Sequence, residues 1–440
     1  MRLLSALTWG CLLPHLADAE AIPRPPPPPP QPQEQQPISL PPQPSPGLQP
    51  QKGISPSLFA SLERTARLVD ITYCVGTSGI TPPFTCVSRC KDFPSLRLVK
   101  TWNTGVLLSD SCGFIAVDEG GGEGYEDAGA LAEALPGDGR APEIVVAFRG
   151  TYSVTNTIVD LSTVPQEYVP YPGDDPSTNT TTPKCANCTV HTGFLASWHN
   201  TRSAILPALL AARARHPRAR VHLVGHSLGG AVAALAALEL RVGLGWGDDV
   251  QVTTFGEPRV GNGGLAGYID AAFGLGGEPK KGEELAYRRM THVGDPVPLL
   301  PLSEWGYRSH GGEVYIGRSE LPPGVGDVRL CRGDRDPECI GGAETEDWLG
   351  WFLGGMRRGR KTEVGVEDEV RAAVEVEEGK LRPRWFPARF KLWQLFFAHR
   401  DYFWRLGLCL PGGDPVDWGR EKYNLTTGEA VVDGTGLGDL

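Results

Sequence analysis

The sequence predicts an α/β protein whose mostly parallel central sheet is flanked by helices on both faces. Two observations lead to this prediction. Short apolar, β-branched segments alternate along the chain with helical patterns. In addition, one such segment, residues 221–224, runs directly into Gly-His-Ser-Leu-Gly at 225–229, and a strong helix former follows at 231–238. A strand, a tight glycine-flanked turn and a helix therefore follow one another without a break.

The other elements can be placed from their apolar patterns. Ordered structure is expected from about Ile54, with an amphipathic helix over residues 58–69. The remaining expected elements are a helix at 204–214 and strands at 144–148, 250–255, 287–292 and 313–316.

Two long stretches interrupt the alternation and are interpreted as insertions within one domain. Residues 119–142 are rich in glycine and glutamate and show no periodic apolar face. Residues 341–384 begin with the tryptophans and apolar residues of 348–353, then become basic at 357–361 and acidic through Glu378. The aromatic cluster either packs on the core or adsorbs to an anionic lipid surface, and we favour packing.

The N-terminus has the pattern of a secretory signal. Met1-Arg2 is followed by an apolar run and by Ala17-Asp18-Ala19, so residues 1–19 are expected to be removed after Ala19. Residues 20–53 form a proline- and glutamine-rich stretch that cannot bury a core and is expected to be a disordered arm. No later apolar run is long enough to span a bilayer. We therefore expect a secreted, extracellular protein.

Composition agrees with export and limits the partners. The net charge of −10 over 440 residues, with no basic stripe to offset it, argues against nucleic acid. Ten cysteines are present, and loss of Cys11 with the signal leaves an odd number. Their spacing fits no zinc site, so disulfides, one spare thiol and no metal are expected. The N-glycosylation sequons are at Asn179, Asn187 and Asn424.

The strand–turn–helix around Ser227 is the setting of a nucleophile elbow. Such a turn strains the serine backbone and exposes its hydroxyl at the positive end of the helix dipole. The alternative is a glycine-rich turn with an incidental serine. Because both flanks fit, we interpret Ser227 as a nucleophile, which then needs a base and a carboxylate to orient that base.

Several further motifs identify a family. In chain order they are Phe148-Arg-Gly-Thr151, Cys185-Ala-Asn-Cys188, His191-Thr-Gly-Phe194, the elbow, Phe255-Gly-Glu-Pro-Arg-Val-Gly-Asn262, Thr291-His-Val-Gly-Asp-Pro-Val-Pro298 and Ala398-His-Arg-Asp-Tyr-Phe403. With these motifs the chain resembles the fungal class 3 lipases, α/β-hydrolases that include triacylglycerol lipases and feruloyl esterases. The resemblance covers about residues 54–411, which implies one α/β-hydrolase domain followed by a tail at 412–440.

The resemblance implies a Ser-Asp-His triad in that chain order. Asp295 matches the family's Asp-x-Val-Pro pattern. Only His310 and His399 lie downstream of it. The family keeps its catalytic base at the place of His399 and a structural histidine at that of His310, so His399 is the expected base. His226 is expected to lie in the turn, to point away from the acyl site and to take no part in proton transfer.

The resemblance also implies an oxyanion hole and a lid. The expected donors are the amides of Leu228, directly after the nucleophile, and Thr151, after the first central strand. Val154, Ile158 and Leu161 recur on one face of a helix, in the segment that the family uses as its lid. The polar residues between them resemble the feruloyl esterases and predict weak interfacial activation.

By the same resemblance Cys74 is expected to pair with Cys409, and Cys185 with Cys188. The local pairs that remain are Cys86 with Cys90 and Cys331 with Cys339, which leaves Cys112 as a buried thiol in a strand.

The sequence thus predicts a secreted serine carboxylester hydrolase, a triacylglycerol lipase that needs no cofactor. It would act on an ester at a lipid–water interface, touch the lipid surface transiently and need no obligate protein partner. The alternatives are a feruloyl esterase or phospholipase with the same triad, a protease, and a non-catalytic binding protein on a hydrolase fold.

Overall fold

The computed structural model describes residues 53–105, 110–118, 142–151, 165–168, 185–276, 285–344 and 397–417, and the short strands 376–377, 380–381, 422–423 and 430–431. All of these lie in one compact unit, Gln51–Leu440. Several expectations fall outside the described residues. They are the signal at 1–19, nearly all of the arm at 20–53, the lid residues Val154, Ile158 and Leu161, the sequons Asn179 and Asn424, and most of the two insertions and the tail.

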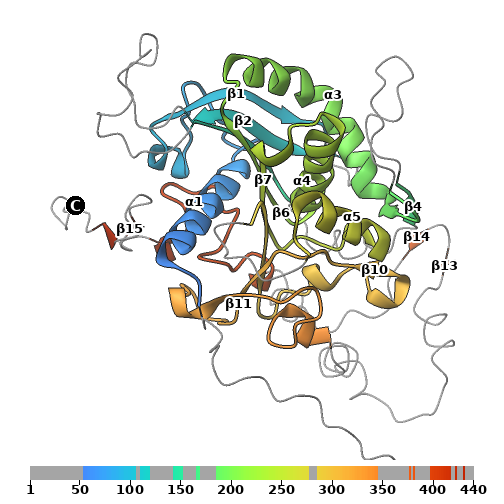
Figure 1. Cartoon of the computed structure of the whole chain (residues 1–440). Coiled ribbons are helices and arrows are strands. Elements are labelled where there is room, and N and C mark those ends of the chain that lie inside the picture. The colour runs from blue at the N-terminus through green and yellow to red at the C-terminus, as the bar shows by residue number, and fades with distance from the viewer. Residues whose placement is uncertain are drawn as a thin grey trace, which may run out of the picture. The chain divides into compact units, whose positions relative to one another are not determined.

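The centre of the fold is an eight-stranded sheet (Figure 1). The strands from β3 to β11 run parallel, and antiparallel pairs close both edges. This confirms the predicted mostly parallel sheet. In spatial order its strands are β1 (Leu96–Asn103), β2 (Cys112–Asp118), β3 (Glu143–Phe148), β6 (Arg220–His226), β7 (Val250–Phe255), β9 (Tyr287–His292), β11 (Glu313–Ile316) and β12 (Val328–Leu330).

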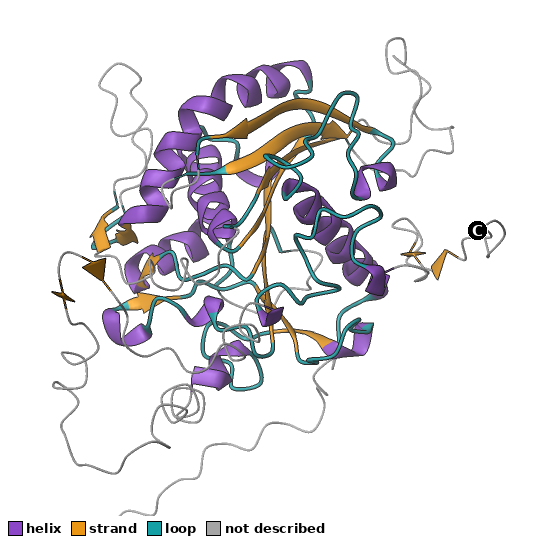
Figure 2. Ribbon diagram, turned by 180° about the vertical axis from the view of Figure 1, so that it is seen from behind, coloured by secondary structure: helices purple, strands orange, loops and turns teal. Residues whose placement is uncertain are grey.

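Helices cover both faces of this sheet (Figures 1 and 2). Along β3, Ile144, Val146 and Phe148 join one apolar core, whereas Val145 and Ala147 join the other. This alternation is the period of two that a strand buried on both faces requires. The first core contains α3 (Thr192–Arg215), α4 (Leu228–Leu238) and α5 (Gly263–Phe273); the second contains α1 (Pro56–Thr72) and the C-terminal segment 402–406.

Smaller elements complete the described structure. A second sheet has the strand order β10 (Tyr307–Arg308), β8 (Gly261–Asn262), β5 (Thr189–His191), β4 (Pro165–Glu167). Two-stranded pairs join β13 (Val376–Glu377) to β14 (Lys380–Leu381) and β15 (Lys422–Tyr423) to β16 (Ala430–Val431). A π-helical turn follows α4 at Glu239–Gly243. The 3-10 turns are Arg89–Asp92, Gly247–Asp249, Val297–Leu299, Ser303–Trp305, Val325–Asp327, Ile340–Glu344 and Pro415–Asp417.

One helix is much longer than its sequence pattern predicted. We expected a helix over residues 204–214, whereas α3 begins at Thr192 and passes through Pro207. Its buried residues include Phe194, Trp198, Thr201, Ile205 and Leu209, which recur at helical spacing. Packing of this continuous stripe therefore outweighs the helix-breaking tendency of Pro207.

None of the helices among the described residues is long and apolar enough to cross a membrane.

Candidate active site

Ser227 sits in the tight turn between β6 and α4. Its backbone has φ 58° and ψ −130°, a conformation that a residue with a side chain rarely adopts. The flanking glycines make the turn possible. A Cβ on Gly225 would collide with the carbonyl oxygen of Gly229, and one on Gly229 would lie 2.6 Å from that of Phe148. Strand and helix thus approach as closely as the predicted elbow requires.

The structure brings His399 to Asp295. The imidazole Nδ1 lies 3.0 Å from both carboxylate oxygens, and both side chains are fully buried. Asp295 follows β9, where its Oδ1 also accepts the amide of Val297 at 3.0 Å. Since a carboxylate can only accept, Nδ1 carries the proton that it donates to Asp295, and Nε2 is the ring nitrogen that faces away from this carboxylate.

Two buried polar atoms at this place have no hydrogen-bond partner among the described residues. They are the Oγ of Ser227 and the Nε2 of His399. Buried polar groups are usually paired, so a serine hydroxyl and an imidazole nitrogen that are both left unpaired here make this place a candidate active site. Gly256 leaves the room for the imidazole, because a Cβ there would lie 2.7 Å from Cε1 of His399.

His310 is engaged elsewhere. Its Nε2 lies 3.0 Å from Oε1 of Glu257, and its Nδ1 lies 2.9 Å from the carbonyl oxygen of Gly311. Its ring also packs edge-on against Tyr287. The histidine that reaches Asp295 is therefore His399, as the sequence analysis expected, and His310 is a buried hydrogen-bonding residue.

The residues expected to form the oxyanion hole flank the elbow. Phe148 at the end of β3 pairs with Gly225 of β6, which brings the following Gly150-Thr151 to the serine. A Cβ on Gly150 would lie only 2.9 Å from Cβ of Ser227. Leu228 is the first residue of α4, so its N–H has no partner within the helix. The two residues expected to supply the oxyanion hole therefore belong to the segments that meet at Ser227.

Tyr402 and Tyr73, which no sequence motif marks as site residues, also reach this site. The Tyr402 hydroxyl donates to Oδ2 of Asp295 at 2.7 Å. Burial, together with the nearby Asp295, raises the pKa of Tyr402 well above its ordinary value, so this hydroxyl stays protonated and keeps donating. The Tyr73 hydroxyl lies 2.6 Å from Nδ1 of His226. His226, which we had excluded from proton transfer, contacts the His399 ring at 4.6 Å between centroids.

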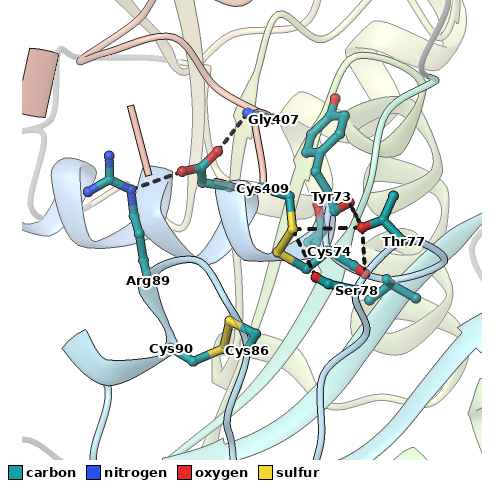
Figure 3. The surroundings of a disulfide bond; sticks show 12 residues. Tyr73, Cys74, Thr77, Ser78, Cys86, Arg89, Cys90, Gly407 and Cys409 are labelled. Atoms are coloured by element: carbon teal, nitrogen blue, oxygen red, sulfur yellow. Dashed lines mark hydrogen bonds and ion pairs between the residues drawn. A yellow bond between two sulfur atoms is a disulfide. The ribbon is translucent and has the colours of Figure 1, made fainter. Parts of the chain in front are cut away.

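The disulfides agree with the expected pairs, and Cys112 is a free, buried thiol in β2. The pairs are Cys74–Cys409, Cys86–Cys90, Cys185–Cys188 and Cys331–Cys339. The first of them ties the end of α1 to the segment that carries His399 (Figure 3). Among the described residues, Glu313 lies close to Cys331 and Cys339, but those two sulfurs are bonded to each other.

The comparisons with known proteins agree with this geometry. The family described as lipase (class 3) matches residues 145–305. A secreted mono- and diacylglycerol lipase of Gibberella zeae is 56% identical over 86% of this chain and 89% of its own length. Lipase A of Sodiomyces alcalophilus is 54% identical over 84% of this chain and 86% of its own length. Among solved structures, the Lip2 lipase of Yarrowia lipolytica superposes with a TM-score of 0.56 at 29% identity, over 68% of this chain and 93% of that one.

The fold and these likenesses define an α/β-hydrolase that cleaves carboxylic esters. The chain belongs to the class 3 lipase family and is a secreted lipase.

Proposed function

We propose that this secreted lipase hydrolyses acylglycerols through Ser227 as nucleophile, His399 as general base and Asp295 as the group that orients the base. The proposal rests on one observation above all. The Asp295–His399 pair leaves Nε2 unpaired in the same buried site as the unpaired Oγ of a strained Ser227.

The proposed reaction runs in two halves. Oγ of Ser227 attacks the ester carbonyl carbon while its proton passes to Nε2 of His399. The amides of Thr151 and Leu228 stabilise the resulting oxyanion. The tetrahedral intermediate then expels the glycerol oxygen, which takes the proton from His399, and an acyl-serine remains. A water molecule activated by His399 attacks this ester, and the fatty acid leaves as Ser227 regains its proton.

The substrate class can be narrowed with the help of the relatives. The sequence indicates a triacylglycerol lipase, and the Gibberella zeae relative is named as acting on mono- and diacylglycerols. We propose that partial glycerides are among the substrates of this chain, and that it meets them at a lipid–water interface. A lid at Val154, Ile158 and Leu161 would suit this, because the triad is fully buried and an ester must be admitted to it.

A substrate panel tests the proposal. The purified protein is assayed on a monoacylglycerol, a diacylglycerol, a triacylglycerol, a phospholipid and a feruloyl ester at equal ester concentration. We expect the acylglycerols to be cleaved fastest. Preference for the feruloyl ester or the phospholipid would replace the proposed substrate class while keeping the triad. Absence of hydrolysis on every ester would favour a binding protein.

Asn187 is the sequon that the described residues contain. Its side chain is exposed in the loop closed by Cys185–Cys188. We propose that it carries an N-glycan in the secreted protein, together with Asn179 and Asn424.

A further inference from the structure

His226, the residue before the proposed nucleophile, lies at the meeting point of the catalytic elements. Its side chain is 1% exposed. Its ring packs against that of His399, with 4.6 Å between centroids and 31° between planes. Its Nε2 lies 2.8 Å from the backbone carbonyl oxygen of His399. One imidazole therefore touches both the ring and the backbone of the base.

The two hydrogen bonds of His226 determine its protonation. A carbonyl oxygen can only accept, so Nε2 of His226 must donate to His399. Burial, together with the neighbouring His399, holds the pKa of His226 well below its usual range, so the ring is neutral. A neutral imidazole with a proton on Nε2 has an acceptor at Nδ1. The Tyr73 hydroxyl, 2.6 Å away, therefore donates to it.

Tyr73 is itself held from several sides. It precedes Cys74, whose disulfide to Cys409 lies beside it in Figure 3. The guanidinium of Arg400 lies 5.2 Å from the centre of its ring. Gly407 leaves room for the same ring, since a Cβ there would come within 3.0 Å of it.

The Tyr73 hydroxyl also borders the loop expected to supply the oxyanion hole. A Cβ on Gly150 would lie 2.7 Å from this hydroxyl, 2.7 Å from the His226 carbonyl oxygen and 2.9 Å from Cβ of Ser227. The hydroxyl thus sits where the Gly150 loop, the elbow and the base segment converge.

We propose that Tyr73 and His226 form a positioning pair that fixes the backbone of His399 and, through it, the direction in which the imidazole faces Ser227. The pair touches neither substrate nor the transferred proton, and the inference rests on the proposed Ser227–Asp295–His399 triad. In this arrangement His226 does more than complete the turn. Through its contacts with Tyr73 and His399, it links the position of the base to that of α1 and the Cys74–Cys409 disulfide.

Three variants test the pair. Tyr73→Phe keeps the ring and its contacts but removes the donated hydrogen bond. His226→Leu removes both hydrogen bonds, whereas His226→Gln keeps an amide donor that can reach the His399 carbonyl. The measurements are KM and the maximal rate on a soluble short-chain ester. Dividing the maximal rate by the concentration of sites that a serine-directed phosphonate titrates gives kcat per titrated site. Because only correctly folded sites count, a merely structural defect does not lower this kcat.

We expect kcat per titrated site to fall about fivefold to tenfold in Tyr73→Phe, from the loss of one hydrogen bond, with KM unchanged. His226→Leu should lose roughly thirtyfold or more, because it also leaves a buried carbonyl unpaired. His226→Gln should recover most of that loss. Phosphonate labelling of Ser227 should slow in parallel, since it needs the same base.

Tyr287→Phe is the matched control. The Tyr287 hydroxyl donates to buried Glu257 at 2.7 Å, and its ring packs on His310, but it touches no member of the proposed triad. We expect Tyr287→Phe to lower the melting temperature about as much as Tyr73→Phe does, but to leave kcat per titrated site unchanged. The positioning role is refuted if Tyr73→Phe keeps the kcat of Tyr287→Phe, or if His226→Gln is as slow as His226→Leu. Failure of the phosphonate to label Ser227 in the unmodified protein would instead refute the proposed function.

Discussion

Ser227→Ala removes a single oxygen, and that oxygen has no hydrogen-bond partner among the described residues. The substitution should therefore leave the melting temperature within about 2 °C, because it breaks no contact and removes little buried volume. Ester hydrolysis should fall at least about a thousandfold, since the proposed acyl-enzyme forms on the Ser227 oxygen. Hydrolysis rates and phosphonate labelling of both proteins measure this. A variant that keeps near-normal hydrolysis would rule out the proposed mechanism.

The two downstream histidines give a paired prediction. His399→Ala should be nearly as damaging as Ser227→Ala, because members of a triad act as a unit. His310→Ala should lower the melting temperature, since it breaks a buried contact with Glu257, but should keep kcat per titrated site. Equal loss of kcat per site in both variants would contradict the assignment of the base.

The buried, neutral His226 predicts a loss of stability in acid. Burial, together with His399, lowers the pKa of His226 in the folded protein, whereas the unfolded chain binds a proton near the ordinary value of 6.5. Below that pH the unfolded state binds more protons, so the free energy of unfolding must fall as the pH decreases. The limiting slope is about 1.4 kcal/mol per pH unit for one group.

Urea unfolding at pH 7 and pH 5 measures this slope, with His226→Gln as the comparison. His292, whose pKa burial also lowers, contributes to the slope in both proteins. The variant should lose less stability than the unmodified protein between these two pH values. An identical loss in both would show that His226 does not titrate as its surroundings indicate.

The three residues of the proposed triad could be proposed from the sequence, because each stands in a local motif. Ser227 stands in a short strand–turn–helix pattern, and Asp295 and His399 stand in family motifs. The supporting contacts could not be predicted in the same way. Tyr73 and His226 meet across a sequence separation of 153 residues, and Tyr402 reaches Asp295 across 107. Such contacts depend on how α1 and the C-terminal segment pack on the sheet, which no local pattern contains.

At the scale of elements, we expect the attachment of α1 to the segment that carries His399 to matter most for stability and for kcat. The Cys74–Cys409 disulfide closes a sequence separation of 335 residues. Beside it, buried Asp70 of α1 accepts from Arg89 Nε at 2.9 Å and from the Gly407 amide at 2.6 Å (Figure 3). The disulfide and the buried hydrogen bond from Gly407 to Asp70 thus hold the same junction.

The double substitution Cys74→Ser with Cys409→Ser should lower the free energy of unfolding by about 2–5 kcal/mol, because a long loop is no longer closed in the unfolded chain. It should also lower kcat per titrated site, since the segment after His399 loses its anchor. The matched control is Cys331→Ser with Cys339→Ser, whose separation is only 8 residues. This control should cost less stability and leave kcat unchanged. Equal effects of the two pairs on kcat would remove any link between the disulfide and the base.

Element boundaries followed from sequence where a pattern was local. The strands β7 and β9 match their predicted ranges. The run of β7 is rich in β-branched residues, whereas β9 also contains Arg288, Arg289 and His292, all of which are buried. The edge strand β1 was not predicted, since Leu96–Asn103 is only partly buried and mixes charged with apolar residues. The first half of α3 was missed because its apolar stripe includes Trp198 and Thr201, and is followed by a proline.

At the scale of the whole molecule, an acidic protein has to meet a lipid surface. The net charge of −10 opposes approach to anionic lipid, so a local basic and apolar cluster would matter more than the average. The stretch 341–384 contains such a cluster, in which Trp348, Trp351 and Phe352 are followed by the basic residues 357–361. This cluster lies outside the described residues.

The final prediction separates the two interpretations of this cluster. In a variant that combines Trp351→Ser with Phe352→Ser, packing on the core predicts a lower melting temperature, because two large apolar side chains lose their buried contacts. Hydrolysis of emulsions and of a soluble ester should then fall together, and this is the outcome we expect. Adsorption predicts the opposite pattern, in which emulsion hydrolysis and binding to anionic vesicles fall while melting temperature and soluble-ester hydrolysis stay unchanged. Because Ser227 and His399 are untouched in this variant, the ratio of the two activities reports the contribution of the insertion independently of the chemistry.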